Sequence, residues 1–350
     1  MFPPLLGRLT HAAPAPAASP AVPAAPPAPL APPTREPISP QTSRFLQANV
    51  VTDKMVDAYF KAAHPTYLVD GQPVVAAPQF RMVGGHNQDN VLVGQRVLGQ
   101  HLGNKEGQIP LSVLGNVLGG RGSPEDVARA TRILLDAGKL PPADPEHSTP
   151  ELRIQLMMWQ HGIGIDCAGY VQQALAQLHG KTPAQLGLKR PLDENLGALA
   201  KNPNFQKIDT LDARPGDIIT LKDNDPGQPG HTVLVVAHAT RTGAELTAKV
   251  DPQLPANKAF LSAAQLDVFS VDSSWGTIQP EPPPPSKDHN APKPKPKAQD
   301  LGGGVERRVW IHNRETNQWA TLEGGVLGEI RNTPYAEHTM AGTFRVKAGP

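Results

Sequence analysis

The residue of this chain best suited to nucleophilic chemistry is its single cysteine, Cys167. It opens the segment CAGYVQQALAQLHG, in which apolar side chains recur at the spacing of one helix face. Amide groups and the dipole at a helix N-terminus favour an anion, so a cysteine there is favoured as the nucleophilic thiolate. A lone cysteine is by default a small buried hydrophobic residue, and it forms no disulfide within its own chain. A catalytic thiol is therefore a hypothesis that needs a base nearby.

His231 is the first candidate for that base, and Asp272 for the residue that orients it. In PGHTVLVVAHA, His231 opens an apolar strand, which places it at the rim of a sheet. Asp272 ends the strand in LDVFSVDSSWG, where a carboxylate could accept the second imidazole N–H and fix the tautomer. Taken singly, the two residues would be a surface histidine and a turn residue.

Two neighbouring residues are separated from these candidates by odd numbers of positions. Because strand side chains alternate between faces, His238, seven positions after His231, should face the opposite way unless a bulge intervenes. Asp267, five positions before Asp272, should likewise face away from it. Neither is expected to line the same site.

Four segments around these residues resemble, in order, the motifs of the NlpC-type papain-like cysteine peptidases, which are bacterial cell-wall hydrolases. They are IDCAGYVQQAL for the nucleophile, ARPGDIITL for the following turn and strand, GHTVLVV for the histidine strand, and FSVDSS for the third polar residue. The resemblance covers roughly residues 149–276. It implies Cys167 as nucleophile, His231 as general base and acid, and Asp272 as the residue that orients His231. The thiolate would attack an amide carbonyl, and water would release the thioester.

The chain departs from the family pattern at three positions. Ala168 replaces the usual serine, and Thr232 stands where a small apolar residue is common. An aspartate, Asp272, occupies the third position, where histidine is more frequent. His312, in VWIHNRETN, is the alternative third member, although a histidine on the sheet surface is the simpler interpretation.

Asp166, Tyr170 and Trp275 are weaker candidates for substrate binding. Asp166 is also the expected N-cap of the Cys167 helix, and the two aromatic rings could form a wall for sugar or peptide or simply pack in the core. One cysteine cannot anchor a multi-thiolate zinc site. We expect no metal and no cofactor.

The surrounding pattern predicts an α+β domain with helices packed on an antiparallel sheet, which the resemblance identifies as papain-like. We expect helices at residues 52–63, 123–138, 150–161 and 167–180. We expect strands at residues 217–221, 232–239, 245–250, 268–271, 305–311 and 318–322. Residues 73–83 should be extended, and Pro78 makes a central strand there unfavourable.

Proline divides the chain into regions. Of 40 prolines, 13 lie in residues 1–40 and 8 in residues 277–300. We expect a disordered Pro/Ala-rich arm (1–42), a mainly helical region of unknown role (43–148) and an NlpC-type catalytic domain (149–350). The Pro/Lys-rich segment 277–300 would be an insertion in that domain, either a spacer or a lid beside the site.

The charge and hydropathy of the sequence limit the kinds of binding partner and the cellular location that we expect. A net charge of +1 gives no overall basic field that would attract nucleic acid. The sequence contains no apolar run of 18 or more residues, so we expect no membrane-spanning helix. The N-terminus lacks the basic start of a classical signal peptide, so the protein would be cytoplasmic or reach the envelope through a specialised secretion system. The secretion route would bring with it a partner from the secretion machinery or an immunity protein.

The resemblance implies a cysteine peptidase or amidase that acts on the peptide stem of peptidoglycan, often at a D-glutamyl–diaminopimelate bond. Two alternatives remain open. One is a transglutaminase-like acyl transferase, which uses the same Cys, His and Asp order. The other is an inactive binding or scaffold protein that docks through its Pro-rich segments.

Overall fold

The computed structural model describes residues 51–80, 111–188, 196–224, 230–247, 255–276, 303–334 and 338–347. Within the chain, Gln41–Pro350 forms one compact unit. The predicted arm (1–42) and the predicted insertion (277–300) lie outside the described residues.

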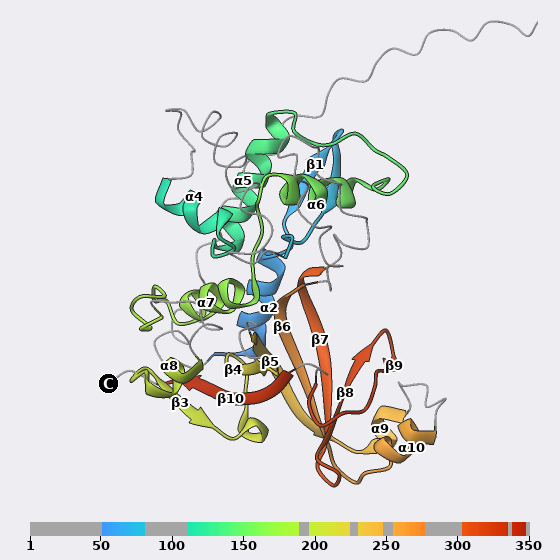
Figure 1. Cartoon of the computed structure of the whole chain (residues 1–350). Helices are drawn as coiled ribbons and strands as arrows, with labels where there is room; N and C mark the ends of the chain where they lie inside the picture. Colours follow the sequence, from blue (N-terminus) through green and yellow to red (C-terminus); the bar gives the residue numbers. More distant parts are fainter. Residues whose placement is uncertain are drawn as a thin grey trace, which may run out of the picture. The chain divides into compact units, whose positions relative to one another are not determined.

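An eight-stranded antiparallel sheet is the main element of this unit (Figure 1). Its strands lie in the order β3-β10-β4-β5-β6-β7-β8-β9, so the last strand of the chain inserts between β3 and β4. The bounds are β3 (Phe205–Ile208), β4 (Ile218–Asp223), β5 (His231–Arg241), β6 (Leu266–Gly276), β7 (Gly303–Asn313), β8 (Gln318–Glu323), β9 (Val326–Leu327) and β10 (His338–Val346). The mixture of helices with an antiparallel sheet confirms the α+β class.

Helices and one hairpin make up the rest of the described structure. They are α2 (Asp53–Ala62), β1 (Thr66–Val69), β2 (Gln72–Val75), α4 (Leu111–Leu118), α5 (Pro124–Asp136), α6 (Pro150–Gln160), α7 (Cys167–Leu178), α8 (Leu196–Lys201), the 3-10 helix η1 (Thr210–Asp212), α9 (Gly243–Thr247) and α10 (Pro255–Leu261). The four predicted helices are confirmed as α2, α5, α6 and α7. Each of these helices starts at a residue whose side-chain oxygen accepts a backbone N–H of the first turn. These N-cap residues are Thr52, Ser123, Thr149 and Asp166.

One predicted strand, residues 245–250, is wrong over its described part. Residues 243–247 form the short helix α9. Thr242 and Glu245 build a reciprocal cap: the Thr242 hydroxyl accepts the Glu245 N–H at 3.4 Å, and the Glu245 carboxylate accepts the Thr242 N–H at 2.6 Å. This Thr-x-x-Glu pattern is a capping box, which predicts a helix start at this position rather than a strand.

Core packing does not follow the predicted boundary between residues 148 and 149. Helix α2 packs with α7 and the sheet, through Val56 and Tyr59. Helix α6 packs instead with α4, α5 and the β1–β2 hairpin, through Ile154 and Met157. Each helix therefore belongs to the core on the other side of that boundary.

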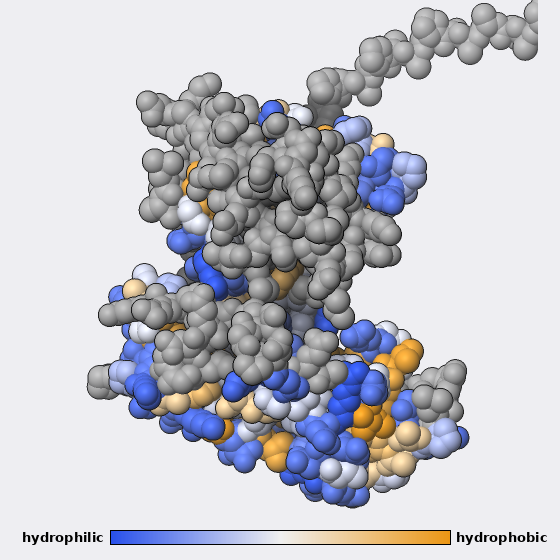
Figure 2. All heavy atoms as spheres, viewed as in Figure 1, coloured by the Kyte–Doolittle hydropathy of each residue, from blue (hydrophilic) through white to orange (hydrophobic). Residues whose placement is uncertain are grey.

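The sheet carries apolar side chains on both faces. One face packs against α7, and the other holds a cluster rich in tryptophan, with Trp275, Trp310 and Trp319. At the β8–β9 end, Figure 2 shows hydrophobic surface, and Val326 of β9 is exposed there. Among the described residues, no helix has the length and apolar character that crossing a membrane requires.

Candidate functional site

Cys167 is the first residue of α7, directly after the helix cap. Asp166 provides that cap, because its carboxylate accepts the Gly169 N–H at 2.5 Å. The Cys167 side chain is buried, with 4% exposed. The predicted placement of the thiol at a helix N-terminus is thus present in the structure, and a thiolate there would face the positive end of the dipole.

The loop after α4 contacts this helix start. The Asp166 N–H donates to the Gly120 carbonyl at 3.0 Å, and a guanidinium nitrogen of Arg121 lies 3.0 Å from the Asp166 carboxylate. The Arg121 carbonyl accepts a hydrogen bond from Gln173 at 2.8 Å. Sequence reasoning missed this loop. Its signal was the glycine-rich GGRG that follows α4.

Two more segments hold the residue before the cap. The Ile165 N–H donates to the Gln79 carbonyl at 2.9 Å, and the Ile165 carbonyl accepts the Ser274 hydroxyl at 2.6 Å. The backbone that leads into Cys167 is therefore held by a residue of β6 and by a residue outside the range that the motifs cover.

Asp272 lies on the sheet face that packs against α7, but its carboxylate is already engaged. Arg307 donates to both oxygens, at 2.7 Å and 2.8 Å, and also contacts Asp57 of α2 at 2.5 Å. Burial raises the pKa of Asp272 to about 6, although Arg307 acts in the opposite direction. Tyr170 packs beside this pair, with its ring 5.1 Å from that of Tyr59. Tyr170 is therefore a core residue of the α2–α7 contact.

His231 projects from the other face of the sheet. Leu234 pairs with Asp272, and His231 lies three positions before Leu234 with regular pairing between them. An odd separation puts His231 and Asp272 on opposite faces. Burial, together with the nearby His338 and Arg308, lowers the pKa of His231 to about 3. The imidazole is thus neutral at neutral pH.

The predicted triad is therefore not assembled on one face. Cys167 and Asp272 share the α7 side, whereas His231 lies on the tryptophan side. The prediction that Asp272 orients His231 does not fit this register, because the carboxylate points away from the imidazole and toward Arg307.

Trp275 is a packed residue. It is 3% exposed, with its ring 4.3 Å from that of His231 and the Arg308 guanidinium 4.2 Å above it. Its indole N–H donates to the Glu306 carbonyl at 3.0 Å. These contacts leave little of the ring for a substrate wall, so of the two alternatives the structure favours packing for Trp275.

A bulge changes the face of His238. The pairing of β5 with β6 shifts between Val235 and Ala237, so His238 projects on the same face as His231. Its ring stacks on Phe269 at 4.2 Å. The expectation from simple alternation is wrong here for the one reason that could overturn it.

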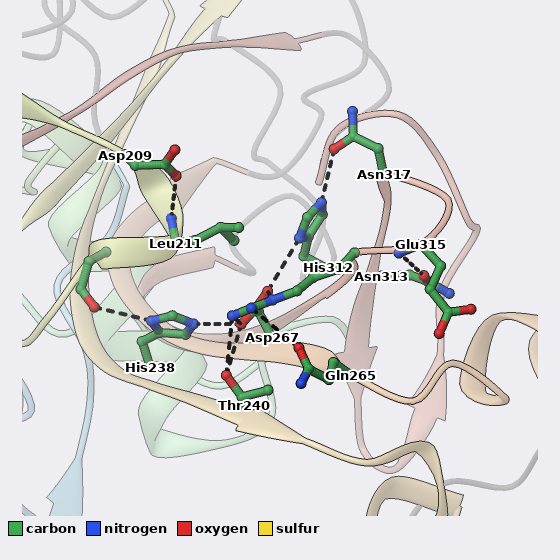
Figure 3. Close-up of polar contacts among 12 residues, drawn as sticks. Asp209, Leu211, His238, Thr240, Gln265, Asp267, His312, Asn313, Glu315 and Asn317 are labelled. Carbon is green, nitrogen blue, oxygen red and sulfur yellow. Dashed lines mark hydrogen bonds and ion pairs between the residues drawn. The ribbon is translucent and has the colours of Figure 1, made fainter.

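His238 and His312 both contact the buried Asp267 (Figure 3). His238 lies 3.0 Å from the Asp267 carboxylate and His312 lies 3.5 Å from it, while Arg314 donates two hydrogen bonds of 2.7 Å. Burial raises the pKa of Asp267, but the bonds from Arg314 and His238 outweigh it and lower the pKa to about 2. This network ties β5, β6 and β7 together. It places His312 with Asp267 rather than with the predicted triad.

The RPGD segment is a structural turn before β4. The Asp217 carboxylate accepts the Arg214 N–H at 2.8 Å and pairs with Arg345 of β10 at 2.8 Å. Gly216 adopts a positive φ of 86°, which favours glycine. The motif thus anchors β4 to β10, and the predicted turn and strand are present.

Among the described residues, no group of three or more His, Cys, Asp or Glu side chains is placed to hold a metal ion. The resemblance to NlpC-type peptidases is carried by the four sequence motifs and by the position of Cys167 at a helix start. Comparison with protein-family models, curated proteins and solved structures found no match for this chain.

Proposed function

We propose that the chain is a cysteine-dependent amide hydrolase of the NlpC-type papain-like kind, with Cys167 as its nucleophile. The observation that carries the proposal is Cys167 as the first residue of a capped helix that packs on an antiparallel sheet. The helix N-terminus favours the thiolate, and the Cys167 backbone N–H is a candidate donor to the oxyanion that forms when the thiolate attacks a carbonyl. The amine of the cleaved bond leaves with a proton, and water then hydrolyses the thioester, which frees the carboxylic acid product and restores the thiol.

The substrate in this proposal is the peptide stem of peptidoglycan. Its support is the ordered set of four motifs, of which the RPGD turn and the capped Cys167 helix have the local structure that the motifs imply. Transfer to an amine instead of water would use the same thioester. An amine acceptor competing with water in the assay distinguishes the two outcomes.

The proposed nucleophile and the predicted base lie on different sides of the sheet. His231 lies on the opposite sheet face, whereas His64, at the end of α2, is close enough to Asp272 to lower the pKa of that carboxyl. Both histidines are therefore tested as the base. His179 follows the other end of α7 and provides the matched control.

The experiment incubates the purified full chain and its Cys167→Ala variant with peptidoglycan stem fragments and identifies products by mass spectrometry. We expect product from the wild type and the His179→Ala variant and none from Cys167→Ala. Equal product from wild type and Cys167→Ala, or none from either across stem substrates, would overturn the proposal. Loss of product in either His64→Ala or His231→Ala identifies the base.

A second candidate is a binding protein without catalysis. It is favoured by the buried thiol of Cys167 and by the placement of His231 on the other face of the sheet. Such a protein would bind stem peptides without converting them, and its thiol would titrate near the free value of about 8.5. Stem-peptide binding measured by calorimetry, together with unchanged peptide in the mass spectrum, would favour this candidate over the hydrolase.

A further inference from the structure

The loop between α4 and α5 brings a cation to the first turn of the nucleophile helix. Arg121 contacts the Asp166 carboxylate at 3.0 Å, and Asp166 directly precedes Cys167 in the chain. Asp166 is 2% exposed, so water screens its charge poorly. The charge of this cap is therefore poorly screened from its neighbour in the chain, Cys167.

The backbone of Arg121 is held on both sides. Its backbone N–H donates to the Asn116 carbonyl at 2.7 Å, and its backbone carbonyl accepts from the Gln173 side chain at 2.8 Å. Gly169 permits this close approach, since a Cβ there would lie 2.1 Å from the Gly120 carbonyl oxygen. The loop and the first two turns of α7 thus form one packed unit.

The cap has two opposing effects on Cys167. The Asp166 carboxylate secures the helix start, whose dipole favours a thiolate. The same negative charge, one residue away, disfavours a second anion. A cation on the carboxylate keeps the first effect and reduces the second.

We infer that Arg121 is a positioning residue for Cys167, which neutralises and fixes the Asp166 cap so that the helix start favours the thiolate. The importance of this role for turnover depends on the proposed function. The thiol itself can be titrated without any substrate.

The test uses the fact that Cys167 is the only cysteine, so every thiol signal of the full chain reports on it. Thiolate absorbance and the rate of alkylation by iodoacetamide are measured against pH. The variants are Arg121→Gln, Arg121→Lys and the double variant Arg121→Gln with Asp166→Asn, in which asparagine still caps the helix. Arg129→Gln in α5 is the matched control.

We expect the thiol pKa to rise by about one unit in Arg121→Gln, which is a roughly tenfold fall in the thiolate fraction below the pKa. Arg121→Lys should restore most of the change, and Arg129→Gln should leave the pKa unaltered. In the double variant the rise should disappear, because the carboxylate that Arg121 offsets is gone. The charged groups packed near α7, Asp272 and Arg307 of the sheet and Asp57 of α2, are the same in every variant.

A folded Arg121→Gln protein with the wild-type thiol pKa would overturn the inference, as would a rise that persists in the double variant. If Arg121→Gln does not fold, Asp166→Asn alone decides: it leaves the Arg121 cation uncompensated beside Cys167, so the thiol pKa should fall, and an unchanged value would overturn the inference. Failure of the proposed function is distinguishable, because it appears as absent turnover in the wild type while the thiol titration still responds to Arg121.

Discussion

Replacement of Arg307 by glutamine should destabilise the protein in a manner that depends on pH. Arg307 donates to both oxygens of the fully buried Asp272 and also contacts Asp57 of α2. Without the guanidinium, Asp272 is left as a buried carboxylate without its cation. The cost appears only when that carboxyl is ionised.

The magnitude follows from the burial and the pair geometry. Loss of one partner of a buried ion pair costs about 3–5 kcal/mol. Arg307 is itself 30% exposed, so we expect the lower end, about 3 kcal/mol at pH 8. Burial already raises the pKa of Asp272 to about 6, from its ordinary value of 3.8, and removal of Arg307 raises it further. Stability associated with this carboxyl is present below about pH 4 and is lost as the pH rises through the folded-state pKa.

Urea unfolding of wild type and Arg307→Gln at pH 5 and pH 8 measures the effect. The deficit of the variant should be small at pH 5, where Asp272 can be protonated, and should grow toward pH 8. Arg214→Gln, which removes an exposed arginine, is the control. A deficit below about 0.5 kcal/mol, or one that does not change with pH, would refute the reasoning and would leave the Asp272 carboxylate available for another role.

Three further predictions concern the helix start, the Asp267 network and the last strand. Gly169→Ala should lower the free energy of unfolding by about 1–3 kcal/mol, because its Cβ would lie 2.1 Å from a loop carbonyl oxygen, whereas Gly115→Ala, with open space around it, should not destabilise; urea unfolding compares the two. The pKa of Asp267 is lowered to about 2, so its contribution of about 2–3 kcal/mol should be present above pH 4 and lost as the pH falls toward 2, and unfolding of Asp267→Asn should lack this part of the acid dependence. Arg345→Met should leave the buried Asp217 without its cation and cost about 3 kcal/mol, which thermal unfolding checks as a lowered melting temperature.

Helix starts could be predicted from sequence because their determinants are local. Thr52, Ser123, Thr149 and Asp166 each cap a helix with a side-chain oxygen from within the same few residues. The neighbours of β10 could not be predicted in this way. Its pairing partners β3 and β4 lie more than 100 residues earlier, and no local pattern states that a C-terminal strand inserts between them.

The candidate site divides along the same line. The position of Cys167 at a helix start is a local property, and it is present in the structure. Whether His231 and Asp272 meet depends on the register between β5 and β6, which pairs Asp272 with Leu234. A residue on β5 shares a face with a residue on β6 only if the latter lies an even number of positions from the β6 residue paired with the former. The sequence of either strand alone does not fix this pairing. The same limit applies to His238, whose face is set by a bulge.

The segments before residue 149 are part of the environment of Cys167. Tyr59 of α2 packs on Tyr170, and its hydroxyl donates to the Tyr170 carbonyl at 3.2 Å. Gln79 accepts the Ile165 N–H, and Arg121 balances the Asp166 charge. Because these contacts reach the cap, the first turn and the residue before it, the described segments that precede the four motifs help to hold helix α7 in place. Residues 51–80 and 111–122 are therefore better understood as a structural part of the proposed catalytic unit.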